Sequence, residues 1–318
     1  MGSRLRIKPP EDYLFKRDVC SYGYFLLAPN RWDPESCTLT RPLLLDHSVA
    51  VLTIGQSKDA PGADLIVQSD IALDRAQQRE ARCRVERMLR LDEHDLSHFH
   101  RVDSRWKRSG RGRLFRSPTL FEDIVKTVTN CNVTWAGTMN MNARLCEVIS
   151  PSFPSPRQLS RKRPATLRSR CGVGYRDERI VALAKLAVAG EIDEDWYADP
   201  SNSDEAVRER LLALPGIGPY AAANIMQLLG RYASLALDTE SVRHGRDILG
   251  FEGESNDIMR RVTEHYERFG DQRFRSYWLD LWSFYEDRRG PAWTWDPATV
   301  GRTFTAALLT QRKRLATP

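Results

Sequence analysis

The sequence predicts an α+β protein that is mainly helical and begins with a β-rich N-terminal domain. The chain has 318 residues, which is enough for two or three packed domains. Residues 12–70 hold short apolar stretches separated by turn-forming runs, whereas apolar residues beyond about residue 95 recur with helical spacing. We therefore predict a β-rich domain at residues 1–95 and a helical core of two subdomains at residues 96–318.

Local patterns place several elements within this plan. The apolar stretches Tyr24–Leu27 and Val49–Leu52 are assigned to the β-rich domain, and Leu73–Leu91 has the pattern of a charged helix. Ser117–Pro118 is expected to open a helix, because proline is well tolerated in a first helical turn. Ile180–Ala189 has the pattern of a short amphipathic helix that the following glycine closes.

Composition and charge narrow the class of protein. Hydrophobic residues make up 41% of the chain, so we expect a substantial core rather than global disorder. The net charge of +6 favours an acidic partner, nucleic acid first and an anionic membrane surface second, although a basic enzyme without such a partner also fits. No apolar run approaches the roughly 18 residues of a membrane helix. A peripheral membrane protein is disfavoured, because no basic amphipathic helix has a broad apolar face.

Cysteine and histidine usage indicates no metal centre built from side chains. The six cysteines form no CxxC pair, so we predict neither a zinc ribbon nor a disulfide framework, and a reducing compartment is the expected location. His98 and His100 have no nearby Cys or His partner, so they are interpreted as surface or packing residues. The N-terminus lacks the apolar core of a secretory signal.

Two basic stretches interrupt the helical region. Residues 101–116 hold seven basic residues against one acid, and residues 157–170 hold six basic residues and no acid. Both contain turn residues and are predicted to be loops. Such clusters neutralise phosphates in nucleic-acid complexes, but a solvated loop without a ligand is an equally good interpretation of either stretch alone.

The most informative segment is a helix, a Gly-x-Gly turn and a second helix at residues 204–230. Ser203 is the expected N-cap of the first helix, and Pro219 stands where the second begins. Gly216 and Gly218 are expected to permit a tight turn with unusual backbone angles. Their missing side chains would let a phosphate reach backbone N–H groups at a helix N-terminus, which grips DNA without reading its sequence.

The segment Leu214–Ile225, LPGIGPYAAANI, resembles the hairpin of the helix-hairpin-helix (HhH-GPD) base-excision DNA glycosylase superfamily. In that superfamily an aspartate follows at the start of another helix, and Asp238 falls at the corresponding distance. The resemblance implies that Asp238 is catalytic; alternatively, it is an ordinary helix N-cap. It also implies DNA contacts from Gly216, Ile217, Gly218, Pro219 and Thr239.

Two weaker matches support the same superfamily. Residues 128–134, VTNCNVT, resemble an Asn-rich turn of 8-oxoguanine glycosylase, which implies that Asn132 enters the duplex beside the orphaned base. A loop Asn that bonds its own backbone is the alternative. Residues 172–176, GVGYR, resemble a segment that packs beside the hairpin. The β-rich start fits the three-domain branch, which contains 3-methyladenine DNA glycosylase II and 8-oxoguanine glycosylase.

The resemblance implies a mechanism in which the target nucleotide is flipped out and its N-glycosidic bond is cut. A carboxylate at Asp238 would stabilise the positive charge on the sugar and could orient or deprotonate water. Bifunctional relatives carry a lysine where this chain has Tyr220, and a phenol cannot form an imine. We therefore predict a monofunctional enzyme without lyase activity, with Tyr220 in the base pocket or packed in its helix.

The aromatic segment 274–285, FRSYWLDLWSFY, is predicted to be helical and to line the base pocket. Tyr277, Trp278, Trp282 and Tyr285 are the candidates to stack on a flipped base, although aromatic residues at this spacing are more often core. We expect only one or two of them to face the pocket. An electron-rich aromatic pocket favours a cationic base such as a 3- or 7-alkylated purine. The stretch Tyr22–Phe25 is expected to supply Tyr22, Tyr24 and Phe25 on the other side.

No cysteine follows Cys171, so the sequence cannot hold the iron–sulfur cluster of endonuclease III-like relatives. The resemblance implies at most a K⁺ or Na⁺ ion on the backbone carbonyls of Leu212, Leu214 and Ile217. The predicted protein is a monomeric glycosylase for alkylated purines in double-stranded DNA, acting in the cytoplasm or nucleoid of a prokaryote or in a eukaryotic nucleus. Oxidised guanine, a mismatched or deaminated pyrimidine, and a non-catalytic DNA-binding protein are the alternatives.

Overall fold

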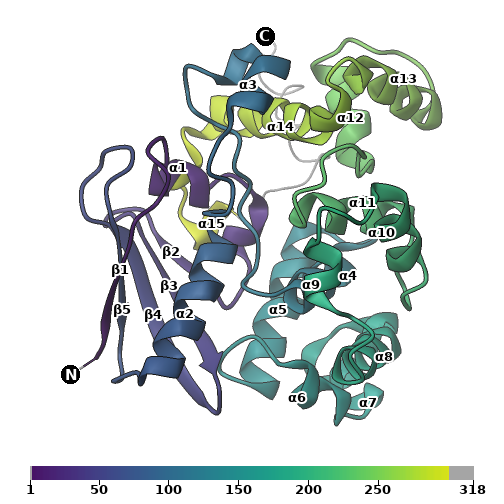
Figure 1. Ribbon diagram of the computed structural model, residues 1–318. Coiled ribbons are helices and arrows are strands. Elements are labelled where there is room, and N and C mark those ends of the chain that lie inside the picture. Colours follow the sequence, from purple (N-terminus) through teal and green to yellow (C-terminus); the bar gives the residue numbers. More distant parts are fainter. Residues whose placement is uncertain (1, 301–318) are drawn as a thin grey trace.

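The computed structural model describes residues 2–300, so the end of the predicted helical core at 301–318 lies outside the described residues. A five-stranded sheet at the start of the chain is followed by a large helical region, as Figure 1 shows. All strand pairs are antiparallel and the order is β1-β5-β4-β3-β2. The strands are β1 (Arg4–Ile7), β2 (Arg31–Asp33), β3 (Thr38–Leu45), β4 (Ser48–Gln56) and β5 (Leu65–Ser69).

The helices account for most of the remaining chain, and residues 167–171 form a single π-helical turn. The first eight are α1 (Phe15–Val19), α2 (Arg75–Met88), α3 (Ser97–Val102), α4 (Leu120–Asn130), α5 (Trp135–Ile149), α6 (Pro156–Ser160), α7 (Pro164–Thr166) and α8 (Asp177–Val188). The others are α9 (Glu194–Ala198), α10 (Asp204–Leu212), α11 (Pro219–Leu228), α12 (Thr239–Asp247), α13 (Ser255–Glu267), α14 (Arg273–Arg289) and α15 (Pro297–Val300). None of the described helices combines the length and apolarity that a membrane crossing requires.

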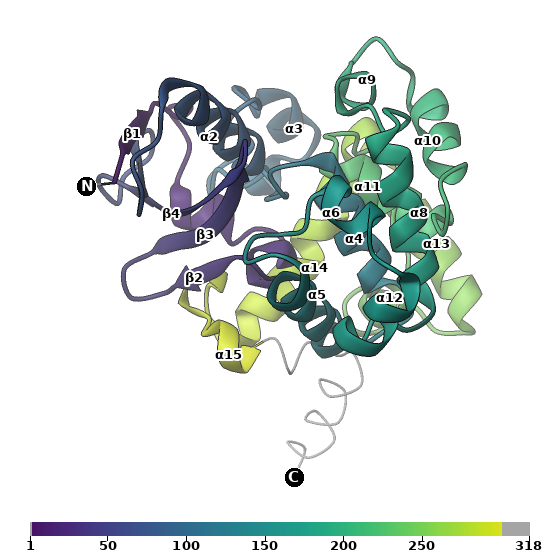
Figure 2. The same cartoon turned by 90° about the horizontal axis from the view of Figure 1, so that it is seen from below.

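The core of the sheet continues into the last helices of the described chain. Helix α2 lies against the sheet, and apolar residues of α12, α13 and α14 belong to the same buried cluster as the strands. After α14 the chain returns to β2, where Trp32 Nε1 donates to the carbonyl oxygen of Trp293 at 2.8 Å (Figure 2). The boundary predicted near residue 95 falls between α2 and α3, and it stays a prediction. A second cluster joins α4, α5, α8, α10 and α11.

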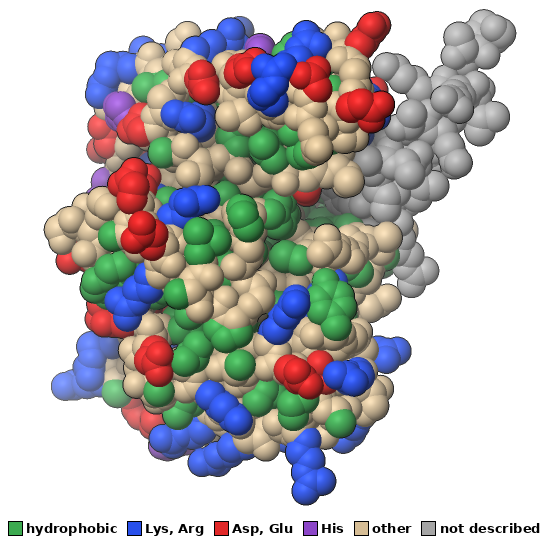
Figure 3. Space-filling model, turned by 90° about the vertical axis from the view of Figure 1, so that its right-hand side faces the viewer, with side chains coloured by type: hydrophobic (Ala, Val, Ile, Leu, Met, Phe, Trp, Pro, Cys, Tyr) green, Lys and Arg blue, Asp and Glu red, His purple; other side chains and the backbone are tan. Residues whose placement is uncertain are grey.

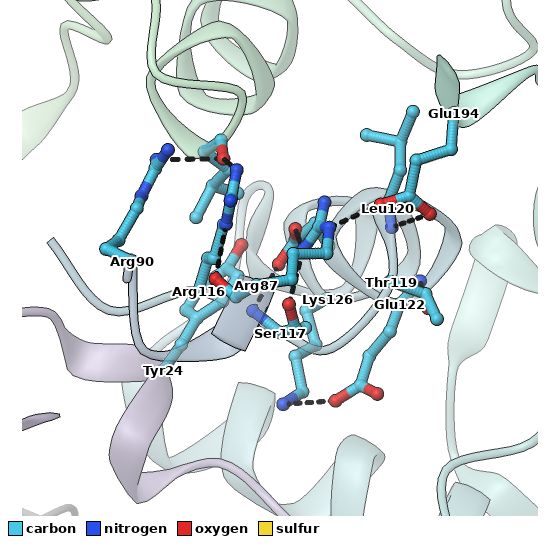
Figure 4. Close-up of polar contacts among 12 residues, drawn as sticks. Tyr24, Arg87, Arg90, Arg116, Ser117, Thr119, Leu120, Glu122, Lys126 and Glu194 are labelled. Atoms are coloured by element: carbon cyan, nitrogen blue, oxygen red, sulfur yellow. Dashed lines mark hydrogen bonds and ion pairs between the residues drawn. The ribbon is translucent and has the colours of Figure 1, made fainter. Parts of the chain in front are cut away.

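Arg90 and Arg116, which come after helix α2 in the chain, bind the end of helix α11. Arg90 donates to the carbonyl oxygens of Gln227 and Leu228 at 2.6 and 2.8 Å, and Arg116 donates to that of Leu228 at 3.1 Å. Figure 4 shows the side chains of Arg90 and Arg116 converging on one carbonyl oxygen. These carbonyls end α11, where helix carbonyls lack the N–H of a following turn; that of Gln227 also accepts the Gly230 N–H at 3.0 Å. The N-terminal region thereby fixes the helix whose other end carries the Gly-x-Gly turn.

Two local predictions of secondary structure were wrong. Residues 23–26 form a 3-10 helix rather than a strand, since Phe25 and Leu27 bond back to Tyr22 and Tyr24. Helix α4 begins at Leu120 and not at Pro118, because the Thr119 hydroxyl accepts the Glu122 N–H and so caps it.

The basic stretches are also not simple loops. Residues 157–170 contain most of α6, all of α7 and most of the π-helical turn, and residues 101–116 include the end of α3 and a 3-10 turn. In the second case the basic side chains are largely used internally. Arg105, Arg111, Arg113 and Arg116 form ion pairs with acidic residues from elsewhere in the chain.

Candidate active site

The predicted hairpin is confirmed as α10, a tight turn and α11. The Ser203 hydroxyl caps α10 by accepting the Ala206 N–H at 3.2 Å. Gly216 has φ +79°, and a Cβ there would lie 2.5 Å from Cδ of Arg179. Gly218 has φ −97°, so the expectation that its backbone angle requires glycine was wrong. A Cβ on Gly218 would meet nothing within 4 Å, which leaves the surface at the start of α11, where Pro219 is exposed, open to a close approach.

The carbonyl groups predicted to hold a monovalent cation lie in this turn. The Ile217 N–H donates to the carbonyl oxygen of Leu214 at 3.2 Å, and Leu212 ends α10. Ile217 is only 5% exposed, so its side chain belongs to the core while its backbone forms the turn. Among the described residues there is no group of three or more His, Cys, Asp or Glu that could hold a metal ion.

A cavity of about 480 Å³ opens between the N-terminal region, the starts of α5, α11 and α12, and one face of α14. This volume suits a small organic ligand such as a nucleobase with its sugar. We call it the aromatic cavity. Its lining consists of Tyr22, Gly23, Tyr24, Asn130, Val133, Thr134, Trp135, Tyr220, Asn224, Ala236, Asp238, Thr239, Glu240, Phe274, Tyr277, Trp278, Leu281, Trp282 and Tyr285.

Asp238 lies in the wall of the aromatic cavity as the N-cap of α12. Its Oδ1 accepts the N–H groups of Glu240 and Ser241 at 2.9 and 3.3 Å, and its own N–H donates to the Ser241 hydroxyl at 3.0 Å. The capping interpretation is therefore correct. It does not exclude chemistry, because the cap fixes the carboxylate in one orientation beside the cavity.

The environment raises the pKa of Asp238 to about 6. Burial is the main cause, since it penalises the charged form, and the negative charge of Glu240 adds to it. Hydrogen bonds from the two backbone N–H groups and from the phenol of Tyr220 oppose the rise. At neutral pH the carboxylate is therefore ionised but weakly solvated, the state in which it interacts most strongly with a developing cation.

Tyr220 lies next to Asp238 in the cavity. Its hydroxyl accepts Nδ2 of Asn130 at 3.2 Å, and burial together with the Asp238 charge raises the pKa of the phenol well above its usual range. The phenol therefore stays protonated and serves as a hydrogen-bond donor. The described lining contains no lysine; Lys126 is buried elsewhere, paired with Glu122 at 2.8 Å.

Helix α14 presents more aromatic surface than predicted. Tyr277, Trp278, Trp282 and Tyr285 all line the cavity, so the expectation that only one or two would face it was wrong. Trp278 and Trp282 stack with centroids 5.4 Å apart, and their indole N–H groups donate to the carbonyl oxygens of Ser21 and Cys20. These bonds tie the rings to the N-terminal region and fix their planes.

The opposite wall is a polar cluster that joins distant parts of the chain. Tyr22 donates to Oδ1 of Asn224 at 2.6 Å, and Nδ2 of Asn224 donates to the Thr127 hydroxyl at 3.0 Å. The Tyr22 ring also lies 4.6 Å from that of Trp278. Tyr22 and Tyr24 therefore occupy the predicted position, whereas Phe25 was predicted wrongly, because it is fully buried in the sheet core.

The turn between α4 and α5 lies at the edge of the cavity. Asn132 is exposed, has φ +52°, and makes no hydrogen bond with a described residue, so the local-bonding interpretation was wrong. Arg176 holds this turn by donating to the carbonyl oxygens of Val128 and Cys131. Thr239, the exposed first residue of α12, lies on another edge.

Sequence reasoning missed several polar residues of the cavity, among them Asn130, Asn224 and Glu240. The first two reach it only through contacts between distant helices, so no local pattern marks them. Glu240 had a signal, because it lies two residues after Asp238 in the same capping segment. As predicted, His98 and His100 are surface and packing residues. His98 is exposed and contacts Asp271, and His100 is half-buried and contacts the carbonyl oxygen of Arg111.

Comparison with known proteins gives the fold but no sequence relative. No family model and no curated protein matches the chain. The 3-methyladenine DNA glycosylase from Archaeoglobus fulgidus is similar with a TM-score of 0.67 at 17% identity, over 90% of this chain and 99% of that one. The Clostridium acetobutylicum 8-oxoguanine glycosylase/lyase gives 0.63 at 14% identity in its apo form, over 88% and 97% of the two chains.

The same Clostridium enzyme in complex with double-stranded DNA containing cytosine opposite 8-oxoguanine gives a TM-score of 0.61 at 14% identity, over 90% of this chain and 98% of that one. The chain thus has the fold of helix-hairpin-helix glycosylases over nearly its full length, and the predicted fold class is confirmed.

Proposed function

We propose that this protein is a monofunctional DNA glycosylase that releases an alkylated purine from double-stranded DNA and leaves an abasic site. The observation that carries the proposal is the position of Asp238, a weakly solvated carboxylate in the wall of an aromatic cavity, beside the start of the hairpin helix. The solved structures with this fold bear the names of DNA glycosylases. A protein that only grips DNA has no use for such a cavity.

In the proposed reaction, the flipped nucleotide places its base between the rings of α14 and Tyr22. The C1′–N bond breaks and its electron pair leaves with the base. Asp238 stabilises the positive charge that forms on the sugar, and water supplies the oxygen that bonds to C1′. A 3- or 7-alkylated purine already carries a positive charge within the nucleotide. It therefore departs as a neutral base and needs no proton donor.

Absence of lyase activity is part of the proposal. A Schiff base requires an amine at C1′, and the cavity has Tyr220 where bifunctional relatives have lysine. The structures of similar fold include a glycosylase/lyase, so activity has to decide this point. The monovalent cation at Leu212, Leu214 and Ile217 also remains a proposal, as does action wherever the cell keeps its DNA.

The deciding experiment uses duplexes that each carry one lesion, such as 7-methylguanine, hypoxanthine, 8-oxoguanine opposite cytosine, or uracil or thymine opposite guanine. We expect strand breaks at the alkylated purine only after hot alkali, and in excess of those in a protein-free control, because hot alkali alone also breaks strands at 7-methylguanine. Breaks without alkali, or a complex trapped by borohydride, would contradict the monofunctional assignment. Release of 8-oxoguanine alone would favour oxidised guanine as the substrate instead.

A basic surface beside the hairpin supports DNA as the partner. Within residues 157–170 only Arg168 forms an ion pair with a described residue, Asp177; Arg157, Arg161, Arg163 and Arg170 are exposed, and Lys162 is half-buried. Arg179 lies against Gly216 and over the ring of Tyr175, which is 49% exposed. Figure 3 shows this side of the molecule, with blue side chains predominating in its lower part.

Replacing Arg161 and Arg163 together with alanine should therefore weaken DNA binding at all sequences alike. The slope of log Kd against log salt should fall by about 2, because two phosphates would no longer be neutralised by the protein. Arg31→Ala, on the outer strand β2, removes an exposed charge far from the hairpin and should leave the slope unchanged. An unchanged slope in the double variant would exclude this surface from the interface.

A further inference from the structure

Glu240 brings a second carboxylate into the aromatic cavity. It lines the cavity together with Asp238, two residues before it. Its Oε2 accepts a hydrogen bond from the Tyr285 hydroxyl at 2.5 Å and another from Nε of Arg243 at 2.8 Å. None of the described residues donates to Oε1. The side chain is therefore held in place while part of its carboxylate stays available.

The cation that pairs with Glu240 lies behind the cavity wall. Arg243 is only 4% exposed, does not belong to the described lining, and rests on the ring of Phe284 at 3.8 Å. Among the described lining residues, Asp238 and Glu240 are the charged ones, and both are acidic. The cavity therefore combines two carboxylates with the faces of several aromatic rings, an environment that attracts cations.

Glu240 works against the ionisation of its neighbour. Its charge is the second cause of the raised pKa of Asp238, after burial. A neutral residue at this position would leave Asp238 more readily ionised. The carboxylate of Glu240 therefore has a cost for the proposed reaction, and a benefit in binding a positively charged ligand would offset it.

We infer that Glu240 is a specificity-determining residue, which makes the cavity select a positively charged base over a neutral base of similar size. This inference rests on the proposed function. The positive charge passes from base to sugar during bond cleavage and stays inside the cavity. Glu240 therefore stabilises the bound base and the transition state to a similar degree, and its effect belongs to binding rather than to the chemical step.

The test compares Glu240→Gln with the wild-type protein on two duplexes, one with 7-methylguanine, a cation, and one with hypoxanthine, which is neutral. Single-turnover rates are measured at pH 8, where Asp238 is ionised in both proteins. We expect the half-saturating protein concentration for the 7-methylguanine duplex to rise about tenfold and that for the hypoxanthine duplex to stay unchanged, because hypoxanthine is neutral when it binds. Glu252→Gln, which removes the same charge at an exposed position, should leave the preference unchanged.

Each outcome decides between the two proposals. If Glu240→Gln raises the half-saturating concentrations for both duplexes equally, or changes neither, Glu240 has no selective role and only this inference fails. Release of hypoxanthine but not of 7-methylguanine by the wild-type protein would overturn both this inference and the proposed substrate class. If the wild-type protein releases neither base, the proposed substrate class fails and the inference fails with it. Glu240→Asp, which keeps the charge, should retain the preference and guards against misfolding as the explanation.

Discussion

Asp238→Asn should reduce base release by about a thousandfold or more while leaving binding to undamaged DNA unchanged. Removing one electrostatic stabiliser of a transition state costs about 10²–10³ in rate, and here the missing charge faces the reacting sugar directly. Asparagine caps helices as well as aspartate does, so the bonds from Glu240 and Ser241 to Oδ1 can persist. The measurement is single-turnover release on the best lesion, together with a Kd for undamaged duplex.

Asp74→Asn is the matched control. Asp74 caps α2 with the same reciprocal pattern of hydrogen bonds, but it is exposed and far from the cavity. It should keep full activity. Base release that survives in Asp238→Asn would overturn the catalytic role of Asp238 and favour a different water-activating group.

Asp238→Asn should also stabilise the protein near neutral pH. The pKa of Asp238 is raised to about 6 in the folded protein from a usual value near 4, so the folded state holds this proton more tightly. The resulting stability is fully present below about pH 4 and is lost as pH rises through 6. This rise of about two units in the pKa corresponds to about 3 kcal/mol of stability at most, and partial solvation of Asp238 reduces it.

Thermal unfolding at pH 5 and pH 8 tests this linkage. Asp238→Asn should gain about 1–2 kcal/mol over wild type at pH 8 and less at pH 5. Wild-type base release should rise with pH through about 6, because the ionised carboxylate is the active form. A variant less stable than wild type at pH 8 would show that the carboxylate is better solvated than its position in the cavity wall indicates.

Arg90→Ala should be the most destabilising single change outside the apolar cores. Arg90 is 1% exposed and donates to the carbonyl oxygens of Leu114, Gln227 and Leu228. Its removal takes the described donor from the carbonyl of Leu114 and one of two donors from each of the other carbonyls, which keep the Gly230 N–H and Arg116. Each lost buried partner costs about 1–3 kcal/mol, so the three together cost about 3–5 kcal/mol. Because these carbonyls end α11, we also expect weaker DNA binding by the hairpin at its other end.

Arg116 should offset part of the loss. Burial and the charges of Arg90 and Arg87 lower the pKa of Arg116 to about 9, and removing Arg90 relieves that repulsion. We therefore expect a loss of about 3 kcal/mol, at the lower end of that range. Denaturant unfolding measures it, with exposed Arg157→Ala as the control that should stay within about 0.5 kcal/mol of wild type. An Arg90 variant as stable as this control would show that water replaces the guanidinium.

The sequence by itself determined the elements whose signals are local. Ser203, the glycine turn and Pro219 specify the hairpin, whereas Asp238 was identified through the resemblance of this segment to the glycosylase hairpin. These predictions succeeded because backbone angles, helix caps and helical periodicity depend on residues a few positions apart.

Only the tertiary structure decided what surrounds Asp238. It turned all four of the predicted α14 aromatics toward one cavity, placed Tyr22 against Asn224 some 200 positions along the chain, and turned Glu240 into the same cavity as Asp238. It also distinguished the two basic stretches. Most basic side chains of residues 101–116 pair with distant acids, whereas most basic side chains of residues 157–170 remain in solvent. Burial and ion pairing are set by contacts between segments far apart in the chain, and no local pattern of residues specifies them.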